Sequence, residues 1–170
     1  VVYLMSKLNP SAFVRLLSRY GVKNPDIHPS MSLCLGPCEI SVAEMVSAYT
    51  AFVNHRIRAS HQFVTRIEDS EGNIIAQFQP QVNEVISETS AHKMLYMLKA
   101  VVDEGTAGRL RHKYNFTGEL GGKTGTTNNN SDAWFMGLTP TLVCGCWVGG
   151  DDRDIHFSSM QIGQGASMTT

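Results

Sequence analysis

Apolar residues recur every three or four positions in three segments of the chain, and this spacing predicts three amphipathic helices. Each segment begins with residues that favour a helix start: a capping asparagine followed by proline, a Ser-x-x-Glu capping box, or a serine. The helices are expected between Asn9 and Gly21, from Ser41 to Val53, and between Ser87 and Gly105. We expect their apolar stripes to face a core rather than a partner protein.

Short strand-like runs occupy much of the remaining chain. Phe63–Ile67 and Ile74–Phe78 flank a polar segment at 69–73, which is typical of a β-hairpin. Leu120–Thr127, Ala133–Leu138 and Leu142–Gly149 follow one another with connections short enough for an antiparallel meander. Helices followed by such a meander predict an α+β fold rather than alternating βαβ units.

Composition and charge exclude several kinds of partner. The 170 residues are 42% hydrophobic and 17% charged, which is ordinary for a globular domain with one core. The net charge of −1 gives no electrostatic reason to expect a nucleic acid or an anionic membrane surface as a partner. No apolar run approaches the ~18 residues that a membrane-spanning helix needs.

The cysteines and histidines do not predict a metal site. The cysteines form the close pairs Cys34/Cys38 and Cys144/Cys146, whose C-x3-C and C-x-C spacings match zinc motifs poorly. The histidines show no ligand spacing. We expect the cysteines to be small buried hydrophobic residues, and a disulfide between the two pairs is left open. No metal and no cofactor is expected.

The densest chemical signal is the segment 121–127, which reads Gly-Gly-Lys-Thr-Gly-Thr-Thr. A phosphate-binding P-loop would need glycine at the position of Thr117, and a helix would have to follow the lysine. The triple asparagine at 128–130 and the apolar run 133–136 indicate a turn and a strand instead. The P-loop interpretation therefore fails on spacing and on context.

A strand that lines a serine acyl-transfer site explains the same residues better. The Lys123 ammonium would supply positive potential, threonine hydroxyls would hold a substrate carboxylate, and a strand N–H would stabilise an oxyanion. Gly125 would let a substrate lie flat against the strand. Lys-Thr-Gly is one element of the S-x-x-K, S-x-N, K-T-G set, although the tripeptide alone also fits an ordinary exposed strand.

A longer window makes the signal specific. The segments 122–127 (G-K-T-G-T-T), 132–137 (D-A-W-F-M-G) and 146–152 (C-W-V-G-G-D-D) closely resemble the end of class A (bifunctional) penicillin-binding proteins. Further matches lie at 35–36, 44–49, 105–107 and 163–166, so the resemblance covers most of the chain from about residue 31. It implies a partial serine β-lactamase/penicillin-binding-protein-like transpeptidase fold, an antiparallel sheet packed with helices.

The resemblance also implies roles for individual residues. Lys123 would polarise the site and Thr126 would supply one oxyanion N–H, so these two are the predicted catalytic residues. Thr124, Gly125 and Thr127 are predicted to bind substrate, with the hydroxyls of Thr124 and Thr126 on its carboxylate. The expected supporting residues are Trp134 and Trp147 as core anchors, Asp132 at a strand entry and Thr106 near the cleft.

The chain does not supply the nucleophile that such a site needs. Ser90-Ala91-His92-Lys93 matches S-x-x-K, but it lies too close to Lys123 for the family order, and no S-x-N occurs. Ser90 falls in the first turn of a predicted helix, where serine commonly caps. We therefore expect residues 1–170 to be the C-terminal portion of one transpeptidase domain, truncated at both ends, with S-x-x-K and S-x-N upstream of residue 1.

Both ends of the chain fit that expectation. The opening run Val1–Leu4 resembles the helix that follows S-x-N in this family. The glycine-rich tail with Gly163 and Gly165 resembles the segment that leads into the family's closing helix, and no closing element is predicted after it.

The function implied by the resemblance is that of a peptidoglycan D,D-transpeptidase. Such an enzyme cross-links the stem peptides of lipid-linked glycan strands by serine acyl transfer and is acylated by β-lactam antibiotics. The fragment alone would be inactive, and its parent would be membrane-anchored and act on the extracytoplasmic (periplasmic) face of the cytoplasmic membrane. A non-catalytic sensor or binding module with the same fold, and a D,D-carboxypeptidase or β-lactamase relative, are the alternatives.

Overall fold

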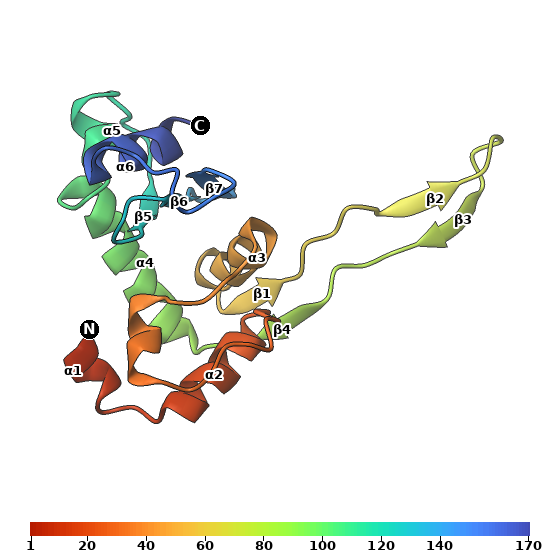
Figure 1. Ribbon diagram of the computed structural model, residues 1–170. Helices are drawn as coiled ribbons and strands as arrows, with labels where there is room; N and C mark the ends of the chain where they lie inside the picture. Colours follow the sequence, from red (N-terminus) through yellow and green to blue (C-terminus); the bar gives the residue numbers. More distant parts are fainter. The chain divides into compact units, whose positions relative to one another are not determined.

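The computed structural model describes all residues from 1 to 170, and they group into two compact units (Figure 1). The first unit comprises Val1–Ala51 and Ile57–Val85. The second comprises Phe52–Arg56 and Ile86–Thr170. Each unit has its own hydrophobic cluster, so each is described by itself.

The two longer helices of the first unit begin where local capping chemistry predicts. The elements are α1 (Val2–Met5), α2 (Pro10–Arg19), the 3-10 helix η1 (Met31–Leu35) and α3 (Val42–Val53), whose last two residues belong to the second unit. The Asn9 side chain accepts hydrogen bonds from the N–H groups of Ser11 and Ala12, and Gly21 has a φ of 90° just beyond the end of α2. The predicted first helix is therefore confirmed.

The capping box of α3 is confirmed and reaches beyond its own helix. The Glu44 carboxylate accepts hydrogen bonds from the N–H and the hydroxyl of Ser41 and from the N–H of Lys23. The Ser41 backbone N–H is the first cause of a pKa of Glu44 below the ordinary glutamate value, because these donors favour the charged carboxylate. The box thus fixes the start of α3 and also holds the segment after α2.

Four short strands complete the first unit as two antiparallel pairs. β1 (Ile57–Ala59) pairs with β4 (Val82–Glu84), and β2 (Arg66–Glu68) pairs with β3 (Ile74–Gln77). The predicted hairpin is confirmed as a pair, but its first strand begins at Arg66 rather than at Phe63 and runs on to Glu68. Figure 1 shows this hairpin projecting away from the helices of its unit.

The second unit is built around a three-stranded antiparallel sheet. Its elements are α4 (Glu88–Asp103), α5 (Arg109–His112), β5 (Gly121–Thr126), β6 (Asp132–Leu138), β7 (Val143–Gly149) and α6 (Met160–Thr169). The strand order is β5-β6-β7, so the predicted meander is confirmed. The expectation that the glycine-rich tail lacks a closing element is wrong, because Gly163 and Gly165 lie inside α6.

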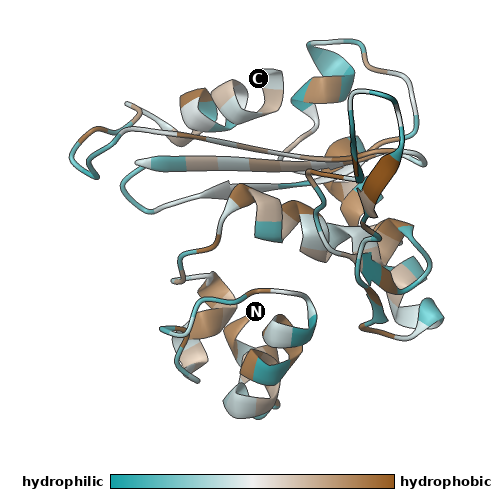
Figure 2. Cartoon of the chain, turned by 90° about the vertical axis from the view of Figure 1, so that its right-hand side faces the viewer, coloured by the Kyte–Doolittle hydropathy of each residue, from teal (hydrophilic) through white to brown (hydrophobic).

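Helices α4 and α6 cover opposite faces of this sheet. A side chain at Gly121 would point at Leu98 of α4, whereas Gly163 of α6 lies against the side chain of Ala133. Gly121 and Ala133 face opposite sides, because Ala133 is paired with Thr126 and side chains alternate along β5. Figure 2 shows α6, which ends at the C-terminus, lying over one side of the strands.

The cysteines are less buried than the sequence predicts. Cys144 is exposed and the other three are half-buried, and all four are free thiols. Cys34 and Cys38 pack at the rim of the cluster formed by Met5, Val22, Ile27 and Leu33. Burial raises the pKa of the Cys38 thiol. No helix of the structure combines the length and the apolar character needed to cross a bilayer.

Candidate functional site

The Lys-Thr-Gly segment lies on an edge strand. β5 forms hydrogen bonds with β6 on one side only, so its other side has no strand partner within this chain. A turn and then β6 follow it, and no helix begins after Lys123. The structure therefore agrees with the rejection of a P-loop. An edge strand leaves alternate N–H and C=O groups available to a ligand laid alongside it.

The pleat of β5 divides the predicted site residues between its two faces. Lys123 and Gly125 point to the face that α4 covers, and Thr124 and Thr126 point to the face that α6 covers. Lys123 is exposed, whereas Thr124 is only 5% exposed. Side chains from both faces of β5 could therefore contact a ligand bound along the free edge. The lysine would do so from one face and the threonines from the other.

Thr124 is already engaged inside the protein. Its hydroxyl lies 2.7 Å from the hydroxyl of Thr106, in the segment that follows α4. Thr106 therefore lies beside the Lys-Thr-Gly strand, and its place near a substrate cleft stays a prediction. This bond ties the end of α4 to the middle of β5.

The Thr126 hydroxyl is the one buried side-chain oxygen or nitrogen in the structure that has no hydrogen-bond partner. Leaving a buried hydroxyl unpaired costs about 1–3 kcal/mol, so such groups are rare and usually have a reason. Thr126 lies at the end of the edge strand, next to the turn at 127–131. Its hydroxyl can donate to an anionic or carbonyl oxygen that reaches this end of β5.

The Lys123 side chain folds back along the strand. Its Nζ donates a hydrogen bond of 2.6 Å to the backbone oxygen of Thr124. The Thr127 N–H donates to the backbone oxygen of Asp132 in β6, so alternation places the N–H and C=O groups of Thr126 and Thr124 on the free edge. The edge would thereby combine a lysine ammonium with at least one strand N–H.

Gly125, the central glycine of the motif, lies close to the neighbouring strand β6. A Cβ placed there would approach the Cβ of Trp134 to 3.2 Å, which is a tight contact. Glycine at this position therefore has a packing reason in addition to the predicted access for a substrate.

The turn after β5 is closed by side chains. Thr127 accepts a hydrogen bond from the Asp132 N–H and shares one with the Ser131 hydroxyl. Asp132 begins β6, as expected for a strand-entry residue, and its carboxylate accepts from the Trp147 indole N–H at 2.9 Å. The Thr127 hydroxyl is thus used within the turn.

Trp147 is not the core anchor that the sequence predicts. Its side chain is 41% exposed, and it bridges β7 to the first residue of β6 through the indole N–H. The sequence gives no sign of this pairing beyond the two residues lying in neighbouring strands. Ser131, which is buried and bonds both Asn129 and Asp132, was likewise not identified from the sequence.

Ser90 is bound by the cap of α4 and is not itself the cap. Its N–H donates to the Ser87 hydroxyl, and the two hydroxyls lie 2.9 Å apart in the first turn of α4. No hydrogen bond links Ser90 to Lys93, so the S-x-x-K match lacks the base contact of an activated serine.

Comparisons with known proteins show the family to which the chain belongs. Residues 18–143 match the penicillin binding protein transpeptidase domain. A penicillin-binding protein 1A of Aquifex aeolicus is 33% identical over 150 residues, covering 88% of this chain and 20% of that protein. The chain therefore spans about a fifth of the length of that curated relative.

Solved structures show the same fold. The 2.6 Å crystal structure of penicillin-binding protein 1A from Haemophilus influenzae gives a TM-score of 0.82 at 22% identity, over 91% of this chain and 28% of that one. PonA1 of Mycobacterium tuberculosis in complex with penicillin V gives 0.77 at 23% identity, over 92% and 46%. The chain belongs to the transpeptidase domain family of the class A penicillin-binding proteins.

Proposed function

We propose that the chain is the substrate-binding part of a peptidoglycan D,D-transpeptidase, with β5 as its K-T-G strand. The observation that carries the proposal is the edge position of β5, which combines an exposed lysine with the unpaired hydroxyl of Thr126. The acyl donor would lie along the free edge as an added strand, since an extended peptide can use the open N–H and C=O groups there. The chain shares its fold with a structure solved in complex with penicillin V, and this supports β-lactams as ligands of the proposed enzyme.

The catalytic roles follow from the charges that develop during acyl transfer. The Lys123 ammonium stabilises negative charge on the attacking oxygen and on the substrate carboxylate, and the Thr126 N–H stabilises the tetrahedral oxyanion. The Thr126 hydroxyl, which has no other partner, binds the substrate carboxylate. Sharing of that carboxylate by Thr124 stays a prediction, since it would require exchange of the bond to Thr106.

Residues 1–170 form only one wall of the proposed site. Acylation needs a serine with a base in reach, and Ser90 is bonded to Ser87. The nucleophile and the S-x-N element would then belong to a longer protein that contains this chain. That protein would be anchored in the cytoplasmic membrane and act outside it, where stem peptides of lipid-linked glycan strands are available.

A fluorescent penicillin tests both parts of the proposal. The isolated chain should take up no covalent label, whereas the full-length protein should be labelled. In the full-length protein, Lys123→Ala should slow acylation by about 100-fold or more, as expected when one preorganised charge or donor is lost. Thr126→Val removes the hydroxyl with little change in volume, and it should slow acylation less because the backbone N–H remains.

Two matched variants serve as controls. Lys93→Ala removes another exposed lysine of the same unit, and Ser90→Ala removes the S-x-x-K match. Both should leave labelling unchanged. A labelled peptide that contains Ser90, or full labelling of the Lys123→Ala protein, would disprove the proposal. An unlabelled full-length protein that still binds stem peptides would indicate a sensor instead.

A further inference from the structure

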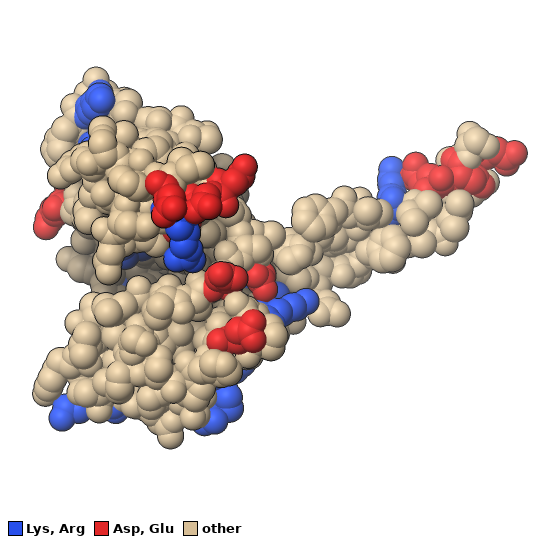
Figure 3. Space-filling view, viewed as in Figure 1, with Lys and Arg blue, Asp and Glu red and all other residues tan.

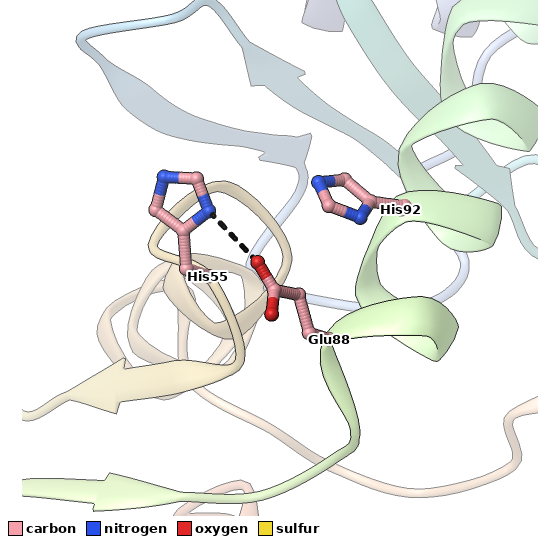
Figure 4. Close-up of side chains that lie close together, drawn as sticks. All are labelled: His55, Glu88 and His92. Atoms are coloured by element: carbon pink, nitrogen blue, oxygen red, sulfur yellow. Dashed lines mark ion pairs between the residues drawn. The ribbon is translucent and has the colours of Figure 1, made fainter.

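We propose that His55, Glu88 and His92 form a binding site for a divalent transition-metal ion, with Zn²⁺ as its best-matched ion. All three residues belong to the second unit, and none takes part in the acyl-transfer site proposed above. One potential ligand atom from each lies within 4.8 Å of the others. Figure 4 shows the two imidazole rings and the carboxylate turned toward a common point.

Two of the ligands are preorganised by helix geometry. Glu88 and His92 are four positions apart in α4, so they lie one turn apart on the same face of the helix. Glu88 is in the first turn, where the helix is regular from its Ser87 cap onward. The helix backbone fixes the relative positions of the two Cα atoms, whatever binds there, and the exposed side chains remain free to rotate.

The third ligand comes from the segment that follows α3. His55 adopts a φ of 46°, in the left-handed region that few non-glycine residues occupy, and it lies beside α4. Its Nδ1 lies 4.0 Å from a carboxylate oxygen of Glu88, and its ring meets the His92 ring edge-on with centroids 6.4 Å apart. The three ligands thus converge from two segments that are far apart in the sequence.

The spacing of the ligand atoms suits a small ion after modest side-chain rotation. Zn²⁺ binds imidazole nitrogen and carboxylate oxygen at about 2.0–2.2 Å, so tetrahedral ligand atoms lie about 3.3 Å apart. The present separations of up to 4.8 Å therefore need to shrink by about 1.5 Å at most. All three side chains are exposed, so rotation about their side-chain bonds meets little resistance.

The donor set selects the class of ion. Two imidazoles and one carboxylate favour zinc and its transition-metal neighbours over Ca²⁺ and Mg²⁺, which prefer oxygen ligands alone. Three protein ligands leave at least one position for water or for a group from another molecule.

Direct contacts among the three side chains explain less well than a shared ion why they lie together. The His55–Glu88 pair is long, and its side chains are 76% and 58% exposed, so as an ion pair it contributes little. The edge-on ring contact is also at the long end of the favourable range. A shared ion would instead join the segment after α3 to the first turn of α4.

The test is titration of the full chain with Zn²⁺ alone, followed by calorimetry and by NMR of the histidine ring C–H groups. We expect one Zn²⁺ per chain, with ring signals of His55 and His92 shifting together. His55→Ala, Glu88→Gln and His92→Ala should each weaken binding by more than about tenfold, which is already the lower end for loss of a supporting residue around a metal.

His61→Ala is the matched control, because His61 is also exposed and also lies against an aromatic ring, that of Phe63. It should leave Zn²⁺ affinity unchanged. Equal affinity in the His92→Ala protein, or a stoichiometry that falls only when His61 is removed, would overturn the proposal. Far-UV circular dichroism of each variant shows that the helices are retained, so lost binding can be assigned to the lost ligand.

Discussion

The β2–β3 hairpin and the β5–β6–β7 sheet are both antiparallel and both have short turns, but they are held together differently. Ile74 and Ile75 are consecutive in β3, so they point to opposite faces, and both are exposed. Phe135 and Met136 are consecutive in β6, and both are buried. Neither face of the hairpin is covered, whereas both faces of the sheet are.

This difference shows what sets the register in each region. In the sheet, a shift of one residue would move each side chain to the opposite covered face, where it would meet a different set of neighbours, so packing specifies the register. In the hairpin, packing specifies little, and its register already shifts between Ile67 and Glu68. The turn of the hairpin is held by side-chain hydrogen bonds instead, because Asp69 accepts hydrogen bonds from Glu71 and from Asn73. Figure 3 shows acidic side chains gathered at the tip of this hairpin.

The same substitution in the two regions should give the largest contrast. Phe135 is 7% exposed and joins a cluster with Val102, Leu110 and Leu120, whereas Phe63, at the base of the hairpin, is 86% exposed. Phe135→Ala should therefore lower the free energy of unfolding by about 3–5 kcal/mol. Phe63→Ala should change it by less than about 0.5 kcal/mol. Chemical denaturation followed by far-UV circular dichroism measures both values.

Equal losses from the two phenylalanine variants would contradict the comparison. Amide hydrogen exchange gives a second test of the difference between the two regions. Phe135→Ala should speed amide exchange across β5, β6 and β7, because the three strands form one sheet that is packed as a unit. Phe63→Ala should leave the exchange of these amides as it is.

The capping box of α3 should give an intermediate effect. Glu44 joins Ser41 and Lys23 by hydrogen bonds, but it is only partly buried. Glu44→Ala should lower the free energy of unfolding by about 1 kcal/mol, as for the loss of a helix cap. Glu39→Ala, an exposed glutamate outside the helix, is the matched control and should have a much smaller effect.

The sign of the pH dependence at Glu44 follows from its lowered pKa. The Ser41 donors favour the charged carboxylate in the folded state, so the folded pKa lies below the unfolded one. The stabilisation is then fully present above the ordinary glutamate pKa and is lost as pH falls through the lowered value. The difference between the natural chain and Glu44→Ala should therefore shrink in acid. A difference that grows in acid would contradict this assignment.

Local signals explain which parts of the fold the sequence could predict. Asn9, the Ser41–Glu44 box and Ser87 act within one turn of their helices, so their helix starts could be placed from neighbouring residues alone. The β1–β4 pair could not be predicted, because each strand has three residues and the partners are distant in sequence. Helix α6 was missed because glycine disfavours helices, yet Gly163 fits there against Ala133 and Phe157.

The sequence predicts which residues belong to the candidate site but not how they are arranged. The motif points to Lys123–Thr127, because its residue types are the ones that the family uses in its reaction. The division of Lys123 and Thr126 between two faces depends on which helix covers each face, and that is a tertiary property. The His55–Glu88–His92 group was missed for the same reason, since only the spacing of Glu88 and His92 is visible in the sequence.

The smallest expected effect is at the turn of the hairpin, where Asp69→Ala removes the acceptor for Glu71 and Asn73. Amide exchange at these two residues should become faster, while the midpoint of global unfolding and exchange in β6 stay unchanged, because the exposed hairpin contributes little to the packed units.

The Asn73 side-chain amide is the first cause of a pKa of Asp69 below the ordinary value. Protection of the turn amides from exchange should therefore be present above that ordinary value and be lost as pH falls through the lowered one. Glu71→Ala is the control, because its side chain makes no hydrogen bond in the turn and only its backbone N–H does. A fall in the midpoint of global unfolding with Asp69→Ala would show that the hairpin is coupled to the packed core, and the contrast between the two antiparallel regions would fail.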